Sequence, residues 1–139
     1  MRYLLDTNVI SELIARRPNW QVVQWVDTLD ADSVYLSVIT IGELRKGIEK
    51  LTDSPRKDTL RAWLTDDLLV RFEGRVLPVD VDVMLAWGEL TGRLERTGRP
   101  LPAIDSLIAA IAIHHGCSLV TRNEDDFKDT GVTALNPWK

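Results

Sequence analysis

Short apolar segments alternate with longer amphipathic ones along the whole chain, and this alternation constrains the fold more than any other feature of the sequence. Segments typical of strands lie at residues 2–6, 33–37, 75–79 and 117–121, and a fifth candidate lies at 131–135. Between them, apolar residues recur at helical spacing. Strands that alternate with helices indicate a parallel sheet with helices packed on its faces. We therefore predict an α/β fold of three layers, α/β/α, with a mainly parallel sheet of four to five strands.

The starts of several helices are predicted from residues that commonly cap them. Asn19 and Asp80 each precede a stripe of apolar residues at helical spacing. Ser54 and Pro55 form a cap followed by proline at the first helical position, and the helix they begin is expected to extend through Phe72.

Length and charge limit the classes of protein to which the chain can belong. Its 139 residues are expected to form one domain, 1–139, large enough to bury a core. The formal net charge of −4 argues against a protein that coats DNA through phosphate contacts alone. No apolar run is long enough for a membrane span, and the N-terminus is acidic where a signal peptide would be apolar. Together with a single cysteine, Cys117, these features favour a cytoplasmic protein without membrane contact.

Four acidic residues lie where the predicted strands end or where a helix returns to that edge. Asp6 ends the first strand, Glu43 follows the second, and Asp126 follows the fourth. Asp105 begins the apolar helix that leads into the fourth strand. Ligands of open α/β sheets bind at the carboxyl ends of the strands. We therefore expect these four carboxylates to face one crevice.

Helix capping is the alternative role for each of these acids. Asp105 could cap a helix that begins at Ser106, and Asp6 or Thr7 could cap the first helix. Thr40 to Glu43 fits a T-x-x-E capping box, and Asn123 with Asp126 fits a capped helical turn. Capping explains each residue singly, but four carboxylates in one crevice repel and raise one another's pKa. Such a group is costly without a cation, and oxygen ligands suit Mg²⁺ or Mn²⁺.

Other catalytic chemistries find less support in the sequence. The two histidines, His114 and His115, are adjacent near the end of one helix and do not face each other, so they make a poor pair of zinc ligands. The chain has no G-x-x-x-x-G-K-[ST], G-x-G-x-x-G or G-x-S-x-G motif. We expect Trp25, Trp63 and Trp87 to anchor the core or an interface rather than to stack on bases.

Four segments resemble, in order and spacing, the motifs of PIN-domain ribonucleases: LLDTNVISEL, ITIGELRKGI, LPAIDSLIAAIA and LVTRNEDDF. With the closing NPW, the resemblance is greatest to the VapC and FitB type of prokaryotic toxin, and it extends over essentially the whole chain. It implies that Asp6, Glu43, Asp105 and Asp126 hold Mg²⁺ or Mn²⁺, with Asp6 and Asp105 at the most regular ligand positions. It also implies supporting roles beside these acids for Thr7, Asn8, Thr121 and Asn123.

The activity implied is metal-assisted hydrolysis of RNA phosphodiester bonds, in tRNA or another structured RNA. Arg45 and Lys46 are candidates for contacts with flanking phosphates, although a solvated helix face explains them as well. The resemblance further implies a homodimer, inhibited by a VapB-like antitoxin that also carries it to promoter DNA. Two alternatives remain: a catalytically silent PIN-like dimer used for binding, and a DNA nuclease or phosphatase with the same acids. A receiver domain is disfavoured because the fourth strand ends in Thr121–Arg122, where that fold needs lysine.

Overall fold

Five parallel strands form a single sheet in the computed structural model, which describes residues 1–139. Their order across the sheet is β3-β2-β1-β4-β5, and every neighbouring pair is parallel. The strands are β1 (Arg2–Leu5), β2 (Val34–Ser37), β3 (Val76–Leu77), β4 (Cys117–Val120) and β5 (Ala134–Leu135). The predicted parallel sheet is confirmed. β1, β2 and β4 are each one residue shorter than the predicted segment, whereas β3 and β5 contain only two residues each.

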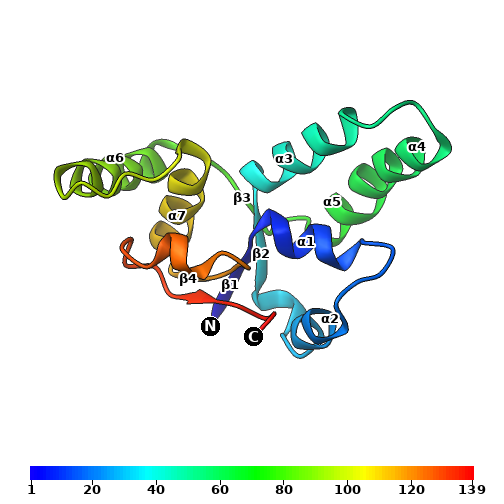
Figure 1. The fold of residues 1–139 in the computed structure, drawn as a ribbon, viewed down its shortest axis with the longest axis horizontal. Coiled ribbons are helices and arrows are strands. Elements are labelled where there is room, and N and C mark those ends of the chain that lie inside the picture. Colours follow the sequence, from blue (N-terminus) through cyan, green and yellow to red (C-terminus); the bar gives the residue numbers. More distant parts are fainter.

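The helices connect consecutive strands and lie on both faces of the sheet (Figure 1). They are α1 (Thr7–Leu13), α2 (Trp20–Asp27), α3 (Val38–Glu49), α4 (Pro55–Ala62), α5 (Leu69–Arg71), α6 (Val81–Arg96) and α7 (Ala103–His115). The chain is helical from Pro55 to Arg71 as predicted, but a π-helical segment, Trp63–Leu68, separates α4 from α5. Short 3₁₀ turns lie at Ala31–Ser33 and Glu124–Phe127.

Alternate residues of the central strands point into two separate cores. Leu4 and Leu119 pack with α6 and α7, whereas Leu5 and Val120 pack with α1, α2 and α3. Because successive strand residues face opposite sides of a sheet, this division places one helical layer on each face. Trp25, Trp63 and Trp87 pack against these cores.

The predicted caps of α2, α4 and α6 are confirmed. The Asn19 side chain accepts a hydrogen bond from the Gln21 N–H, and that of Asp80 accepts one from the Val83 N–H, both at 2.9 Å. Ser54 caps α4, with Pro55 at its first position. No helix combines the length and the hydropathy that crossing a membrane would need.

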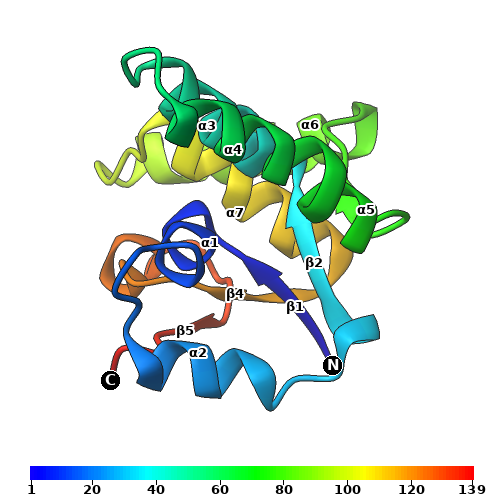
Figure 2. The same ribbon diagram turned by 90° about the vertical axis from the view of Figure 1, so that its right-hand side faces the viewer.

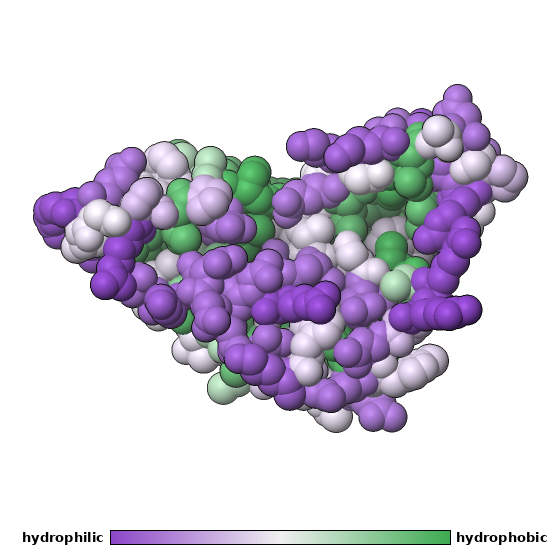
Figure 3. All heavy atoms as spheres, viewed as in Figure 1, coloured by the Kyte–Doolittle hydropathy of each residue, from purple (hydrophilic) through white to green (hydrophobic).

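A notch opens at the carboxyl edge of the sheet, between two arms. One arm consists of α6 and α7, and the other of the hairpin formed by α3 and α4, which lie side by side (Figure 2). The starts of α1 and α3 lie between these arms, and α7 begins beside them on the arm that it forms with α6 (Figure 1). Hydrophobic surface is visible on both sides of the notch in the space-filling view (Figure 3). The fold therefore directs three helix starts toward one place.

Candidate active site

A polar hollow of about 520 Å³ lies at the carboxyl ends of β1 and β4. It is lined by residues at the start of α1 and on α1, α3 and α7, and by residues of the segments that follow β4 and β5: Asp6, Thr7, Asn8, Ser11, Glu12, Glu43, Asp105, Arg122, Asn123 and Trp138. Three of the four predicted acids, Asp6, Glu43 and Asp105, therefore meet in one hollow. We refer to it as the carboxylate hollow.

Asp6 is the most buried of these acids, with 7% of its surface exposed. It follows β1 directly and precedes α1, and its Oδ1 accepts a hydrogen bond from the Thr7 N–H at 2.8 Å. Its Oδ2 accepts a second bond, from the Thr121 hydroxyl, at 2.9 Å. Asp6 thus caps α1, as the alternative role predicted, and lines the hollow at the same time.

Glu43 is held by a threonine of α1 rather than by its own helix. The Thr7 hydroxyl lies 2.6 Å from Glu43 Oε1 and 3.1 Å from the hydroxyl of the buried Thr40. The capping box predicted for Thr40 and Glu43 is wrong, because α3 begins earlier and is capped by Ser37, whose side chain accepts from the Thr40 N–H. Glu43 consequently lies in the second turn, where its carboxylate reaches α1.

Thr121, fully buried at the end of β4, is the centre of a second set of hydrogen bonds. While its hydroxyl donates to Asp6, it accepts from the Asn8 side-chain amide at 3.3 Å and from the Asn123 N–H at 3.1 Å. Asn8 Oδ1 in turn accepts from the Arg122 N–H. The polar residues predicted to support the acids therefore form one network that fixes Asp6 and the turn after β4.

Asp105 does not cap α7. The helix begins at Ala103 after Pro102, and no side chain caps it. Asp105 is the third helical residue, so its half-buried carboxylate stands in the first turn, where the helix dipole favours an anion. The alternative, a helix that begins at Ser106 and is capped by Asp105, is wrong: α7 begins directly after Pro102, and the Ser106 N–H already donates to the Pro102 carbonyl at 2.9 Å.

Asp126 lies on the other side of Asp105, in the 3₁₀ turn after β4. It lines an adjoining hollow with Asp105 and Arg99, not the carboxylate hollow itself. The turn predicted after Asn123 is present, but Asn123 contributes its carbonyl rather than a side-chain cap. Asp105 is thus shared between the two hollows.

Burial and mutual repulsion raise the pKa of two of these carboxyls. The pKa of Asp6 is raised by burial first, against the lowering effect of its hydrogen bonds, and further by Asp105 and Glu43. That of Asp105 is raised by burial, then by Asp126 and Glu43. No counter-ion among the side chains relieves this repulsion, because no salt bridge involves any of the four acids.

The donor set fits a hard cation that keeps part of its water. No group of three acidic, histidine or cysteine side chains is close enough to hold a metal ion. Mg²⁺ is usually held by one or two carboxylates together with waters and substrate phosphates, not by a cage of protein ligands. Carboxylates gathered around a polar hollow, each repelled by the others, match that arrangement.

Arg45 and Lys46 do not line the carboxylate hollow. Arg45 pairs with Glu49 on the same helix, with Nε and Oε1 3.0 Å apart. Lys46 lines a separate depression beside Glu43, between α3 and Ile104.

Four residues that line the hollow were absent from the predicted site. Ser11 and Glu12 follow Asn8 at i+3 and i+4, so helical spacing could have placed them on the same face of α1. Arg122 and Trp138 come from two loops, and no spacing rule connects them.

Residues 3–132 match the PIN domain family. The chain is a PIN-domain protein. It is 39% identical to Toxin FitB of Neisseria gonorrhoeae over 97% of both chains. It is 35% identical to VapC ribonuclease Y4jK of Sinorhizobium fredii, over 98% of this chain and 97% of the relative. Within the PIN-domain family it belongs to the VapC and FitB type of toxin ribonuclease.

The PIN fold itself superimposes closely on a solved relative. The structure of FitAB bound to an IR36 DNA fragment matches with a TM-score of 0.94 and 37% identity, over 99% of this chain and 96% of the other. The five-stranded parallel sheet and its helices are thus those of a PIN domain of this type.

Proposed function

We propose that this PIN domain is a Mg²⁺- or Mn²⁺-dependent endoribonuclease, the toxin of a toxin–antitoxin pair. The observation that carries the proposal is the convergence of Asp6, Glu43 and Asp105 from three elements on one hollow, with Asp126 beside Asp105. A relative 35% identical over almost the whole chain is a VapC ribonuclease, which supports RNA as the substrate.

Asp6 and Asp105 are the residues that we propose to hold the cation, and Glu43 and Asp126 complete its surroundings. A bound divalent cation lowers the pKa of its water and stabilises charge that develops on the phosphate oxygens. The cation would also offset the repulsion that raises the pKa of Asp6 and Asp105. An acidic protein can then accept an anionic backbone at this site.

Hydrogen bonds within the chain hold the acidic side chains in position. Thr121 and the Thr7 N–H hold both Asp6 oxygens in place, so the orientation of this carboxylate is fixed and both hydrogen bonds oppose the rise in its pKa that burial causes. The Thr7 hydroxyl fixes one oxygen of Glu43 and leaves the other to orient a water toward the phosphate. Asp105 has no protein partner that would compete with a cation. These fixed positions reduce the reorganisation needed during hydrolysis.

The partners of this chain are inferred from its relatives and from the apolar side chains that it exposes. FitAB is solved on DNA, which supports an assembly in which a VapB-like antitoxin inhibits this chain and carries it to promoter DNA. Val81, Met84, Leu85 and Ile104, on α6 and α7, expose apolar side chains beside the notch. Clustered apolar surface is typical of protein contacts, so we assign this arm to the homodimer or the antitoxin.

RNA cleavage by the purified chain, free of antitoxin, tests the proposal. Total tRNA and single-stranded DNA would be incubated with Mg²⁺, Mn²⁺ or EDTA, using wild type, Asp105→Asn and Asp125→Asn. Asp125 is an exposed acid outside both hollows and serves as the matched control. Metal-dependent cleavage of RNA that only Asp105→Asn lacks is expected. Cleavage of DNA alone would make the chain a DNA nuclease, and no cleavage by a folded protein would favour a binding module.

A further inference from the structure

The carboxylate hollow contains one cationic side chain and one large apolar side chain, and the two are in contact. Arg122 follows β4 by two residues, and Trp138 lies in the segment after β5. The guanidinium carbon of Arg122 lies 5.4 Å from the centroid of the Trp138 ring. This distance is typical of a cation–π interaction, which holds a guanidinium while leaving its N–H donors free.

The guanidinium of Arg122 has no anionic partner, although carboxylates line the same hollow. Arg122 forms no salt bridge, whereas Arg45, Arg61, Arg71 and Arg99 are all paired with acids. Its hydrogen bonds use only the backbone: its N–H donates to Asn8, and its carbonyl accepts from Asn136. The side-chain donors therefore remain available to an anion from outside the chain.

Asn136 fixes the two partners relative to each other. Its side-chain amide donates to the Arg122 carbonyl at 3.0 Å, and its Oδ1 accepts from the Trp138 N–H at 2.9 Å. The indole N–H of Trp138 donates to Glu12 Oε1 at 3.1 Å, which ties the ring to α1. A single asparagine thus links the loop after β4 to the loop after β5. The pair is organised before any ligand binds.

We propose that Arg122 binds the phosphate that neighbours the scissile one in the RNA, with Trp138 and Asn136 as its positioning residues. The inference rests on the proposed nuclease function, because the phosphate must belong to a chain whose next phosphate lies at the carboxylates. Guanidinium groups bind phosphate through two parallel N–H donors, and an aromatic face restricts the guanidinium plane. Arg122 therefore selects the position of the backbone, while the acids and their cation act on the adjoining bond.

Binding of a fluorescently labelled single-stranded 12-nucleotide RNA, followed by anisotropy, tests this role. All variants would carry Asp105→Asn so that the RNA is not cut, and Kd would be measured from 50 to 300 mM salt. Arg122→Gln is expected to weaken binding about tenfold and to lower the salt slope by about 0.7, the loss of one phosphate contact on a single strand. Arg56→Gln is the matched control, since Arg56 is exposed on α4, has no salt bridge and lies outside the hollow.

Three further variants separate a binding role from a structural one. Trp138→Phe keeps an aromatic face and should retain most of the affinity, whereas Trp138→Leu should weaken binding by several-fold with melting temperature within a few degrees of the parent. Arg122→Lys keeps the charge, so the salt slope should be preserved while affinity falls only partly.

An unchanged Kd and salt slope for Arg122→Gln would overturn the inference, as would equal losses for Arg122→Gln and Arg56→Gln. This outcome differs from failure of the nuclease proposal. In that case, chains without the Asp105→Asn change would cleave no RNA at all, whatever stands at position 122.

Discussion

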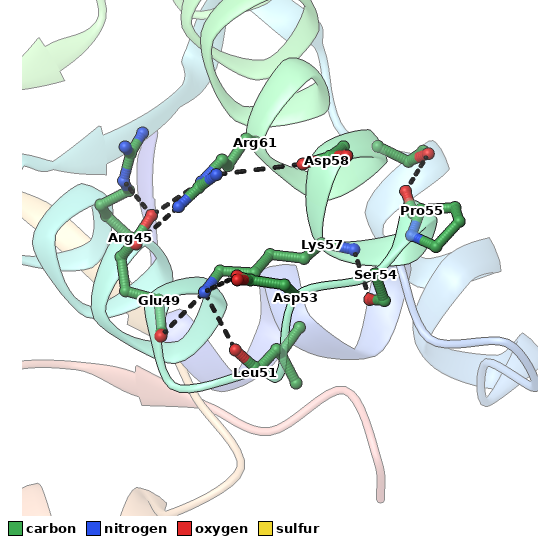
Figure 4. A network of polar contacts seen from close by, with 10 residues as sticks. Arg45, Glu49, Leu51, Asp53, Ser54, Pro55, Lys57, Asp58 and Arg61 are labelled. Carbon is green, nitrogen blue, oxygen red and sulfur yellow. Dashed lines mark hydrogen bonds and ion pairs between the residues drawn. The ribbon is translucent and has the colours of Figure 1, made fainter.

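The carboxylate hollow and the α3–α4 hairpin both contain acidic and basic side chains, but the acidic side chains have opposite kinds of neighbour in the two regions. In the hairpin Glu49 lies between two bases, Arg45 and Arg61, and pairs with both (Figure 4). In the hollow, acids face acids. The pKa of Glu49 is lowered to about 2, first by its hydrogen bonds with Arg61, whereas those of Asp6 and Asp105 are raised.

The hairpin also contains a buried lysine that completes its turn. Lys57 is 8% exposed, and its Nζ donates to the carbonyls of Glu49 and Leu51, at 3.2 and 2.9 Å, and contacts Asp53. Glu49 is the last residue of α3 and Leu51 lies two residues beyond it, at the helix end where backbone acceptors lack partners. Glu49 and Lys57 of the hairpin are therefore both paired with other groups of the chain, while the hollow leaves its charges for a ligand.

The largest expected difference between substitutions in the two regions is in RNA-cleaving activity. Asp105→Asn removes a carboxylate that has no protein partner, and we expect RNA cleavage to fall by more than the roughly 100-fold typical of losing a residue that only orients a metal ligand. Glu49→Gln, which removes one charge from the hairpin, should leave the specific activity within about twofold of wild type. Single-turnover cleavage assays measure both. Equal losses in the two variants would remove the distinction between the regions.

Stabilisation by metal is the next effect in size. If Mn²⁺ binds the folded chain only, free Mn²⁺ at about 100 times its Kd stabilises that chain by about 2.7 kcal/mol, which raises Tm by several degrees. Asp105→Asn should lose most of this shift, and Glu49→Gln should keep it. Without metal, Asp105→Asn should melt at or above the wild-type temperature because repulsion is relieved. Asp6→Asn is a poorer probe, since Asp6 also accepts from Thr121 and caps α1.

Removal of the buried lysine should affect stability but not chemistry. Lys57→Met leaves two carbonyls without their donor, and we expect the free energy of unfolding to fall by about 1–3 kcal/mol. Urea unfolding measures this loss, with Lys128→Met, at an exposed position, as the control. Cleavage per folded molecule should not change. An unchanged free energy of unfolding in Lys57→Met would mean that water replaces the ammonium at the end of α3.

The smallest expected effect is on how stability depends on pH. The pKa shifts that cause this dependence have opposite directions in the two regions. The raised pKa of Asp105 means that the folded chain binds more protons, so in EDTA the advantage of Asp105→Asn over wild type should shrink as pH falls from 7 through that pKa. The lowered pKa of Glu49 contributes stability above its unfolded value of about 4.5 that is lost as pH falls toward about 2. Wild type should accordingly lose its advantage over Glu49→Gln on acidification. Urea unfolding across this pH range measures the stability difference between wild type and each variant. A difference that changes with pH in the other direction, for Asp105→Asn or for Glu49→Gln, would contradict the prediction.

Local chemistry was sufficient to predict the strands, their parallel arrangement and several helix starts. Asn19, Ser54 and Asp80 cap their helices because a short polar side chain before an apolar stripe needs only its own helix to act. The acids at the sheet edge were also predictable, because the end of a parallel strand has a known location in the fold.

Contacts between distant segments could not be predicted from local patterns. Glu43 fits a capping box, yet it bonds Thr7, 36 residues away, because α3 begins at an earlier serine. Arg122 and Trp138 are in contact and are both held by Asn136, but neither residue has a spacing that predicts the other. The π-helical segment after α4 likewise has no counterpart in the periodicity of its sequence.

Calorimetric titration of Mn²⁺ into the metal-free chain measures directly whether the carboxylate hollow binds a divalent cation. We expect saturable binding to wild type and to Glu49→Gln, and a loss of at least tenfold in affinity for Asp105→Asn. Binding should also release protons at a pH close to the raised pKa values, because the carboxyls must be ionised to hold the ion. Equal affinity in wild type and Asp105→Asn, or no saturable binding to the folded chain, would contradict the proposal that these carboxylates hold a divalent cation.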